Sequence, residues 1–265
     1  MNLFRAFLQG AVLSLFDLLR NNYTYHSGAL TYHFLLSMAP LTIVLLNLVS
    51  LLPMVELSEI ERTLDRFFPQ YTNRVVQEIL EVQKRSGQTS LIALGISYFF
   101  SVGFIKYMGR AFAFVSEGEL GEKRELFYWL FMPVFLLGTV LVISLSFLLS
   151  IYIKLVIPTG YSLLLDLSYV LPGALMLSLI YRSFLKRGIG VTRLFLLSTY
   201  ISLLMFLSQL AFTWYIAHLF KGSLLYGSLS TIVVSLLWIN LIFLILLYGA
   251  RLIHRLREFE DAKGS

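Results

Sequence analysis

The sequence contains no cysteine and few charged residues. Without cysteine the chain can form no disulfide, no thiolate nucleophile and no thiolate metal site. Charged residues make up 14% of the 265 residues, whereas a soluble domain carries about 25%. Hydrophobic residues reach 58%, and the mean hydropathy is +0.79. These values predict a polytopic membrane protein rather than a soluble domain.

Local motifs of known enzymes are also missing. The four histidines are His26, His33, His218 and His254, and none of them stands in an H-E-x-x-H zinc motif. The sequence has no G-x-S-x-G elbow and no phosphate-binding G-x-x-x-x-G-K-[ST] loop. We therefore expect no catalytic residue, no metal and no cofactor. The net charge of +6 is attributed to basic loops that face anionic lipid, not to nucleic-acid binding.

Two acidic features allow more than one interpretation. Asp166 falls within an apolar stretch, and burial of a carboxylate in the bilayer costs at least ~2.5–3.5 kcal/mol. We favour the interpretation that Asp166 is an interfacial carboxylate in contact with water or Lys154. The alternative is that Asp166 has a functional role. The acidic residues between Glu117 and Glu125 are interleaved with basic ones, which favours a solvated turn over a metal-dependent nuclease site.

The apolar residues fall into six runs, each long enough for the roughly 20 residues that cross a bilayer as a helix. We therefore predict an all-α polytopic membrane protein with one membrane domain. Its six transmembrane helices are predicted at residues 28–53, 90–115, 127–157, 162–184, 194–220 and 224–253.

The remaining segments have their own patterns. Residues 1–27 carry apolar residues at helical spacing, so this amphipathic helix lies either in the membrane interface or on the protein's own bundle. Residues 54–88 form an amphipathic helical loop, and residues 254–265 form a basic tail. If the N-terminus is inside, 14 Lys and Arg residues fall on the inner side and seven on the outer side. This bias predicts that both termini are cytoplasmic and that residues 54–88 face outward.

Polar residues and prolines within the spans indicate where a cavity could form. Proline removes a backbone hydrogen bond and tends to kink a helix, and kinked helices favour cavities. The repeat of Gly227, Thr231 and Ser235 suits close helix packing, with a mildly polar groove as the alternative. The residues that we expect to line a lipid or substrate cavity are Tyr32, Ser37, Pro40, Asn47, Pro172, Gln209, Tyr226, Gly227 and Asn240.

Two stretches carry a family resemblance. Residues 29–40, ALTYHFLLSMAP, are similar to the A-x-A-Y-x-x-L-L-S-x-x-P motif of the YihY/BrkB family of bacterial inner-membrane proteins, formerly labelled ribonuclease BN. Residues 226–232 and 247–250 resemble the family's Y-G-S-L-A and L-x-G-A-E motifs. The chain departs from the family at Arg251, where a glutamate is usual, and lacks the proline usual near Leu185.

The resemblance implies a six-span protein without ribonuclease activity. It also implies a role in envelope integrity, with membrane lipids as cargo and lipid-transfer proteins as partners. The outer loop at residues 54–88 could dock such a periplasmic partner, and the alternative is that it lies on the outer leaflet. A small-solute transporter or channel is the first alternative to lipid transport. An intramembrane hydrolase or nuclease is the second, and the histidines and carboxylates argue against it.

Overall fold

A computed structural model describes residues 3–49, 91–117, 124–156, 169–185, 189–218 and 227–264. Within these ranges every regular element is an α-helix, so the predicted all-α class is confirmed. The predicted outer loop at residues 54–88 and Asp166 lie outside the described residues. The helices are α1 (Leu3–Arg20), α2 (Tyr23–Val49), α5 (Leu91–Val115), α6 (Glu125–Val156), α8 (Val170–Phe184), α9 (Val191–His218) and α10 (Gly227–Gly264).

Three of the described helices have a stretch that is long and apolar enough to cross a membrane, judged by length and composition alone. These stretches are Glu125–Ile153 in α6, Val191–Ile216 in α9 and Val233–Phe259 in α10. Two shorter apolar stretches, Ala6–Leu18 and Val170–Phe184, belong to α1 and α8. The count of six spans stays a prediction.

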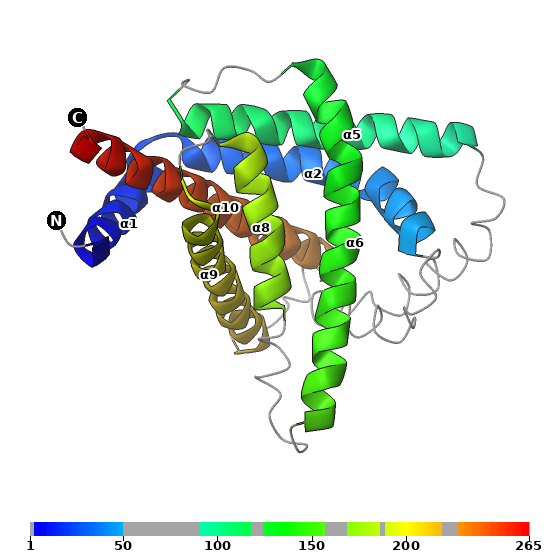
Figure 1. Ribbon diagram of the computed structural model, residues 1–265. Coiled ribbons are helices and arrows are strands. Elements are labelled where there is room, and N and C mark those ends of the chain that lie inside the picture. Colours follow the sequence, from blue (N-terminus) through cyan, green and yellow to red (C-terminus); the bar gives the residue numbers. More distant parts are fainter. Residues whose placement is uncertain are drawn as a thin grey trace.

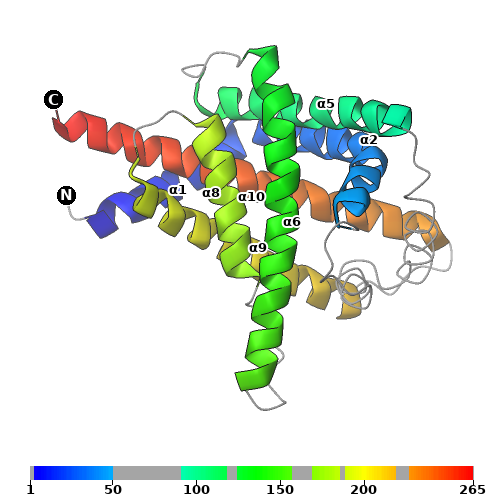
Figure 2. The same cartoon turned by 45° about the vertical axis from the view of Figure 1, so that its right-hand side comes forward.

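The helices are arranged as two close pairs joined by α10. Helices α2 and α5 lie side by side, and so do α8 and α9 (Figures 1 and 2). Helix α10 contacts α1, α2, α5 and α9, while α6 packs against α8 and α5. The C-terminal part of α2, which contains Pro40, turns away from the rest of that helix in both views. This bend is expected because proline removes one backbone hydrogen bond of the helix.

The last helix extends beyond the span predicted for it. Helix α10 runs from Gly227 to Gly264, whereas the predicted span ends at residue 253 and runs into a basic tail. Between Ala250 and Gly264 the sequence has neither proline nor glycine, and it is rich in Arg, Leu and Glu. These residues are good helix formers, so nothing in the sequence ends the helix at the membrane surface.

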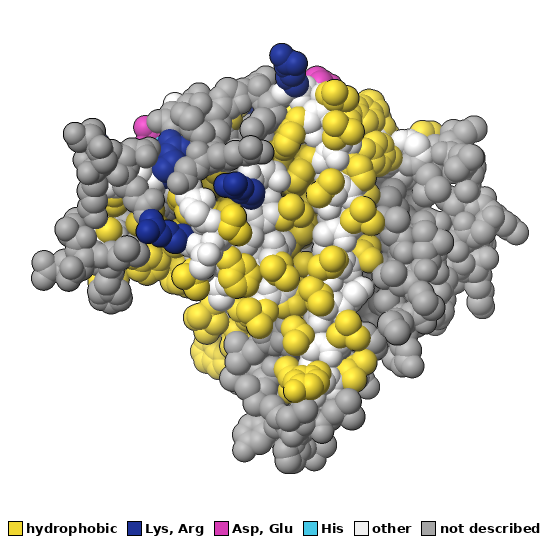
Figure 3. All heavy atoms as spheres, in the orientation of Figure 1, with side chains coloured by type: hydrophobic (Ala, Val, Ile, Leu, Met, Phe, Trp, Pro, Cys, Tyr) yellow, Lys and Arg dark blue, Asp and Glu magenta, His cyan; other side chains and the backbone are white. Residues whose placement is uncertain are grey.

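Helix α6 presents an apolar stripe to the outside. Leu126, Leu130, Val134, Leu137 and Leu141 are exposed, and their spacing places them on one helix face. In Figure 3 hydrophobic side chains cover this face over most of its length. On the opposite face, Tyr128, Phe131, Met132 and Leu136 are buried in the core. An exposed apolar face of this kind is what a helix in contact with lipid requires.

Close packing explains the glycine in one of the two C-terminal motifs. A Cβ at Gly249 would clash with the hydroxyl of Tyr181 in α8 and lie 2.8 Å from Ile201 in α9. Tyr181 is fully buried and donates a hydrogen bond to the backbone oxygen of Leu246, at 3.0 Å. Glycine at position 249 therefore lets three helices meet at the core.

Candidate ligand pocket

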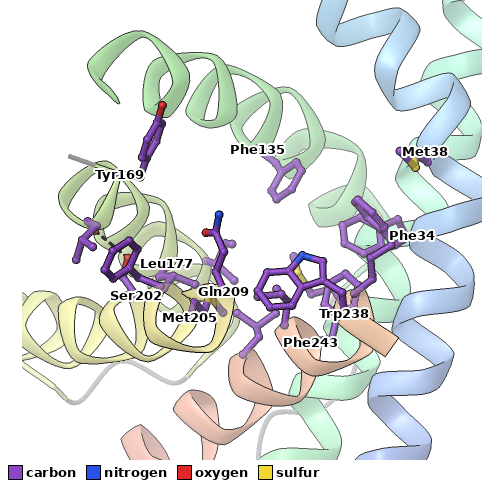
Figure 4. Close-up of a pocket in the computed structure, with 18 residues that line it drawn as sticks. Phe34, Met38, Phe135, Tyr169, Leu177, Ser202, Met205, Gln209, Trp238 and Phe243 are labelled. Carbon is purple, nitrogen blue, oxygen red and sulfur yellow. Dashed lines mark hydrogen bonds between the residues drawn. The ribbon is translucent and has the colours of Figure 1, made fainter. Parts of the chain in front are cut away.

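A pocket of about 520 Å³ lies where the two helix pairs meet α10. Among the described residues, eighteen line it, and they come from α2, α5, α6, α8, α9, α10 and the turn before α8 (Figure 4). Its volume falls within the range of pockets that bury small ligands, roughly 300–1,000 Å³. Of the described residues that line it, none carries a formal charge.

One part of the pocket is an aromatic cluster. The rings of Phe34 (α2), Phe104 (α5) and Phe243 (α10) contact one another pairwise, with centroid distances of 5.5, 5.6 and 5.8 Å. Phe135 of α6 adds a fourth ring, 6.2 Å from Phe104. Because the rings come from four helices, the cluster depends on the assembled fold.

Polar groups lie in another part, on α9 and the start of α8. Ser202 donates a hydrogen bond to the backbone oxygen of Val170, at 2.8 Å. Gln209 lies two turns further along α9 and extends into the pocket (Figure 4). Tyr169 lies at the N-cap of α8 and also lines the pocket. The described lining is therefore almost entirely apolar with a few polar groups, which suits a ligand that is mostly hydrocarbon.

Four of the nine predicted cavity residues lie in the pocket or beside it. Gln209 lines it. Ser37 is buried next to Met38, but its hydroxyl bonds to the backbone oxygen of Phe34 within α2, at 2.9 Å. Asn240 accepts a hydrogen bond from Ser27 at 3.0 Å and so joins α10 to α2. Pro172 is buried in the first turn of α8, where a backbone N–H has no partner within the helix, so its missing N–H costs no hydrogen bond within α8.

Of the other five predicted residues, Tyr32 is absent from the described lining of the pocket. Tyr32 is 59% exposed, with its ring against His33. Gly227 is the first residue of α10. Pro40 and Asn47 belong to the C-terminal part of α2. Tyr226 lies outside the described residues.

Sequence reasoning missed the aromatic and methionine residues that form most of the pocket. Phe34 stands within the first motif, but Phe104, Trp238, Phe243 and Met205 have no motif around them. The helices that carry them are apolar on all sides, so helical periodicity does not distinguish a pocket face from a lipid face.

A second polar cluster lies at the C-terminal end of α5. Arg251 is 5% exposed and makes three hydrogen bonds: to Asp17 of α1 at 2.7 Å, to the backbone oxygen of Val115 at 3.2 Å, and to Glu117 at 2.5 Å. Arg255 also binds Asp17, at 2.5 Å and 2.9 Å. This cluster connects α1, the end of α5 and α10.

The cluster contains a carboxyl with a lowered pKa, that of Asp17, and a residue with an unusual backbone conformation, Glu117. Burial by itself would raise the pKa of the Asp17 carboxyl, but hydrogen bonds from Arg251 and Arg255 outweigh it and hold that pKa below its usual value. Glu117 has a φ of 54°, in the left-handed region that costs a residue with a Cβ about 1–2 kcal/mol. We attribute the tolerance of this conformation to the bond between Glu117 and Arg251.

Comparison with known proteins places the chain in a family. A sequence profile described as Virulence factor BrkB matches residues 15–264. The chain belongs to the BrkB family. This confirms the resemblance seen in the two C-terminal motifs and in the motif at residues 29–40. The BrkB profile spans every described helix except the first turns of α1.

Relatives of this BrkB family member are described as membrane proteins. A UPF0761 membrane protein of Mannheimia succiniciproducens is 27% identical over 88% of this chain and 84% of its own length. A UPF0761 membrane protein of Haemophilus influenzae is 26% identical over 89% of this chain and 90% of its own. No solved structure matches the chain. The chain is therefore a membrane protein of this family, and the names of these relatives state no reaction.

Proposed function

We propose that the chain is a non-enzymatic protein of the bacterial inner membrane that supports envelope integrity by moving phospholipid towards the outer membrane. The observation that carries this proposal is the pocket among the helices, whose described lining is uncharged and almost entirely apolar, with Gln209 as one of its few polar groups. A lipid chain is the apolar ligand that every membrane supplies at high concentration. The outward apolar stripe of α6 gives the protein the lipid contact that such a role requires.

A small-solute transporter or channel is the second candidate. Such proteins bind their solutes and coupling ions at polar or charged groups near the middle of the membrane. Ser202 and Gln209 are the groups that would serve this role, but fourteen of the eighteen described lining residues are aliphatic, methionine or phenylalanine. This lining supports a lipid over a hydrated solute.

Filling the pocket tests the proposal. Met205→Trp would insert an indole into the pocket, whereas Leu207→Trp places the same side chain on the exposed side of α9. Native mass spectrometry of protein released from nanodiscs should show lipid bound to the wild type and to Leu207→Trp. In Met205→Trp we expect the bound fraction to fall about tenfold, because overpacking costs ~1–3 kcal/mol. Equal lipid retention in all three proteins would remove the pocket from the proposed function.

The proposed topology places both termini in the cytoplasm and residues 54–88 in the periplasm, where a lipid-transfer protein could dock. Since the chain has no cysteine, single cysteines can be introduced without removing others. Gln70→Cys should react with a membrane-impermeant maleimide on intact spheroplasts, and Gln9→Cys should react only after lysis. The reverse pattern would contradict this topology.

A further inference from the structure

We infer that the pocket holds one acyl chain, with its ester carbonyl hydrogen-bonded to the amide of Gln209 and its tail against Phe34, Phe104 and Phe243. This inference rests on the proposed function and specifies which part of the lipid enters. One-chain and two-chain lipids both carry an acyl ester, so either class of lipid can supply the chain.

The amide of Gln209 supplies the polar contact. It is half-buried and extends into the pocket (Figure 4), and no side chain or backbone group of the described ranges pairs with it. A polar group that loses water without gaining a partner costs about 1–3 kcal/mol. A ligand that supplies a partner therefore binds more tightly than one that does not.

An ester carbonyl can pair with this amide because it accepts a hydrogen bond that the amide N–H can donate. Ser202 has one hydroxyl hydrogen, and its bond to Val170 uses that hydrogen. Gln209 has two N–H donors. Among the Ser202 and Gln209 side chains, Gln209 is thus the donor available to a carbonyl oxygen.

The tail part of the pocket suits a flexible hydrocarbon. The three phenylalanine rings form its wall. Met38 and Met108 lie beside them in the lining, and methionine adapts its shape to irregular ligands. An acyl chain gains contact with both residue types and requires no hydrogen-bond partner.

Charge and volume limit what enters. With no formal charge among the described lining residues, nothing in the lining offsets the desolvation of a phosphate. The headgroup therefore stays outside the pocket. A volume of about 520 Å³ suits one small ligand, so a two-chain lipid inserts a single chain and leaves the second in the bilayer.

An ester and ether pair of lipids tests the inference. The probes are palmitoyl lysophosphatidylcholine and its ether analogue, which lacks the carbonyl, together with the matching two-chain ester and ether phosphatidylcholines. The proteins are the wild type, Gln209→Leu, Gln209→Met and the control Gln9→Leu, which makes the same change at an exposed site on α1. Affinities come from native mass spectrometry titration, and melting temperatures verify that each variant is folded.

We expect the wild type and Gln9→Leu to prefer the ester over the ether by about three- to tenfold, the worth of one hydrogen bond. Both Gln209 variants should lose this preference while they retain binding of the ether lipid. A preference seen with the one-chain pair alone or with the two-chain pair alone supports the inference and identifies the source of the acyl chain.

Equal affinity of the wild type for ester and ether lipids would overturn the inference, as would a preference that survives in both Gln209 variants. In either case lipid still binds, and the proposed function is untouched. Failure of the proposed function has a different signature, in which neither lipid binds the wild type more tightly than Met205→Trp.

Discussion

The side chain of Arg251 concentrates contacts from distant parts of the sequence. Its guanidinium reaches Asp17 in α1 and both Val115 and Glu117 at the end of α5. Asp17 receives further hydrogen bonds from Arg255. A buried ion pair contributes little net stability compared with apolar residues of the same volume, but removal of one partner is costly. The cluster is thus best tested by changing its charges separately and together.

We predict that Arg251→Met lowers the free energy of unfolding by about 1–3 kcal/mol, because it leaves Glu117 and the backbone oxygen of Val115 without their donor. The ~3–5 kcal/mol typical of a broken buried pair does not apply, since Asp17 keeps Arg255. Arg251→Glu should cost more, because it places a third carboxylate beside Asp17 and Glu117.

Thermal unfolding in detergent measures these effects. The double variant Asp17→Arg, Arg251→Glu restores one attractive pair between α1 and α10, so its melting temperature should exceed that of Arg251→Glu alone. A melting temperature for Arg251→Glu equal to that of the wild type would show that the cluster does not hold α1 in place.

At the scale of one element, α1 has two predicted interpretations, a helix in the membrane interface and a helix packed on the protein's own bundle. Ala6, Gly10 and Ser14 recur every four residues and are buried, and α1 packs against α10. Small residues of this kind let two helices approach closely. Val12 and Phe16 lie on the exposed side. The helix therefore packs on its own bundle, and contact of its outer face with the membrane interface stays a prediction.

We predict that Gly10→Leu displaces α1 from α10. Even a Cβ at position 10 would lie 3.3 Å from Leu256 and 3.4 Å from Leu252, so a full leucine side chain does not fit. The readout is maleimide labelling of Ser14→Cys, a fully buried position. We expect labelling to accelerate about tenfold in Gly10→Leu, the effect of ~1.4 kcal/mol, and to stay unchanged in the exposed control Gln9→Leu. Equal rates in both would contradict close packing at Gly10.

Elements were easier to predict than the pocket they form. Long apolar runs indicated helices, because a span needs about 20 apolar residues and little else. Hydroxyl and amide groups were used as markers of a cavity, yet Ser37 bonds within its own helix and Asn240 bonds to Ser27. Of the nine predicted residues Gln209 lines the pocket. The aromatic lining resembles any lipid-facing surface in sequence, and its convergence from four helices appears in the tertiary structure alone.

At the scale of the whole molecule, α10 connects the ionic cluster to the pocket. Arg251 lies in the ionic cluster, and Leu246 lines the pocket about one and a half turns earlier on the same helix. Between them lies Gly249, against which Tyr181 of α8 and Ile201 of α9 both pack. Tyr181 contacts both positions, since its hydroxyl bonds to the backbone oxygen of Leu246 and lies against Gly249. The fit of Tyr181 against α10 should therefore influence both stability and ligand binding.

We predict that Gly249→Ala destabilises the protein although helix propensity alone would favour alanine by about 1 kcal/mol. The new Cβ would clash with the Tyr181 hydroxyl and lie 2.8 Å from Ile201, so one of these helices must shift. The expected net cost is about 1–2 kcal/mol. Gly103→Ala on α5 is the control, because no atom of the described residues, apart from the backbone of α5 itself, lies within 4 Å of its added Cβ, and it should be neutral or stabilising.

A double-mutant cycle identifies the cause of this cost. Tyr181→Phe alone removes the hydrogen bond to Leu246 and should cost about 1 kcal/mol. It also removes the oxygen that meets the new Cβ, so Gly249→Ala combined with Tyr181→Phe should cost less than the sum of the two single variants. Because Leu246 lines the pocket, Gly249→Ala should weaken lipid binding, and the double variant should recover part of it. Strict additivity in both measurements would mean that Tyr181 and Gly249 act independently, and that α8 does not couple the core to the pocket through this contact.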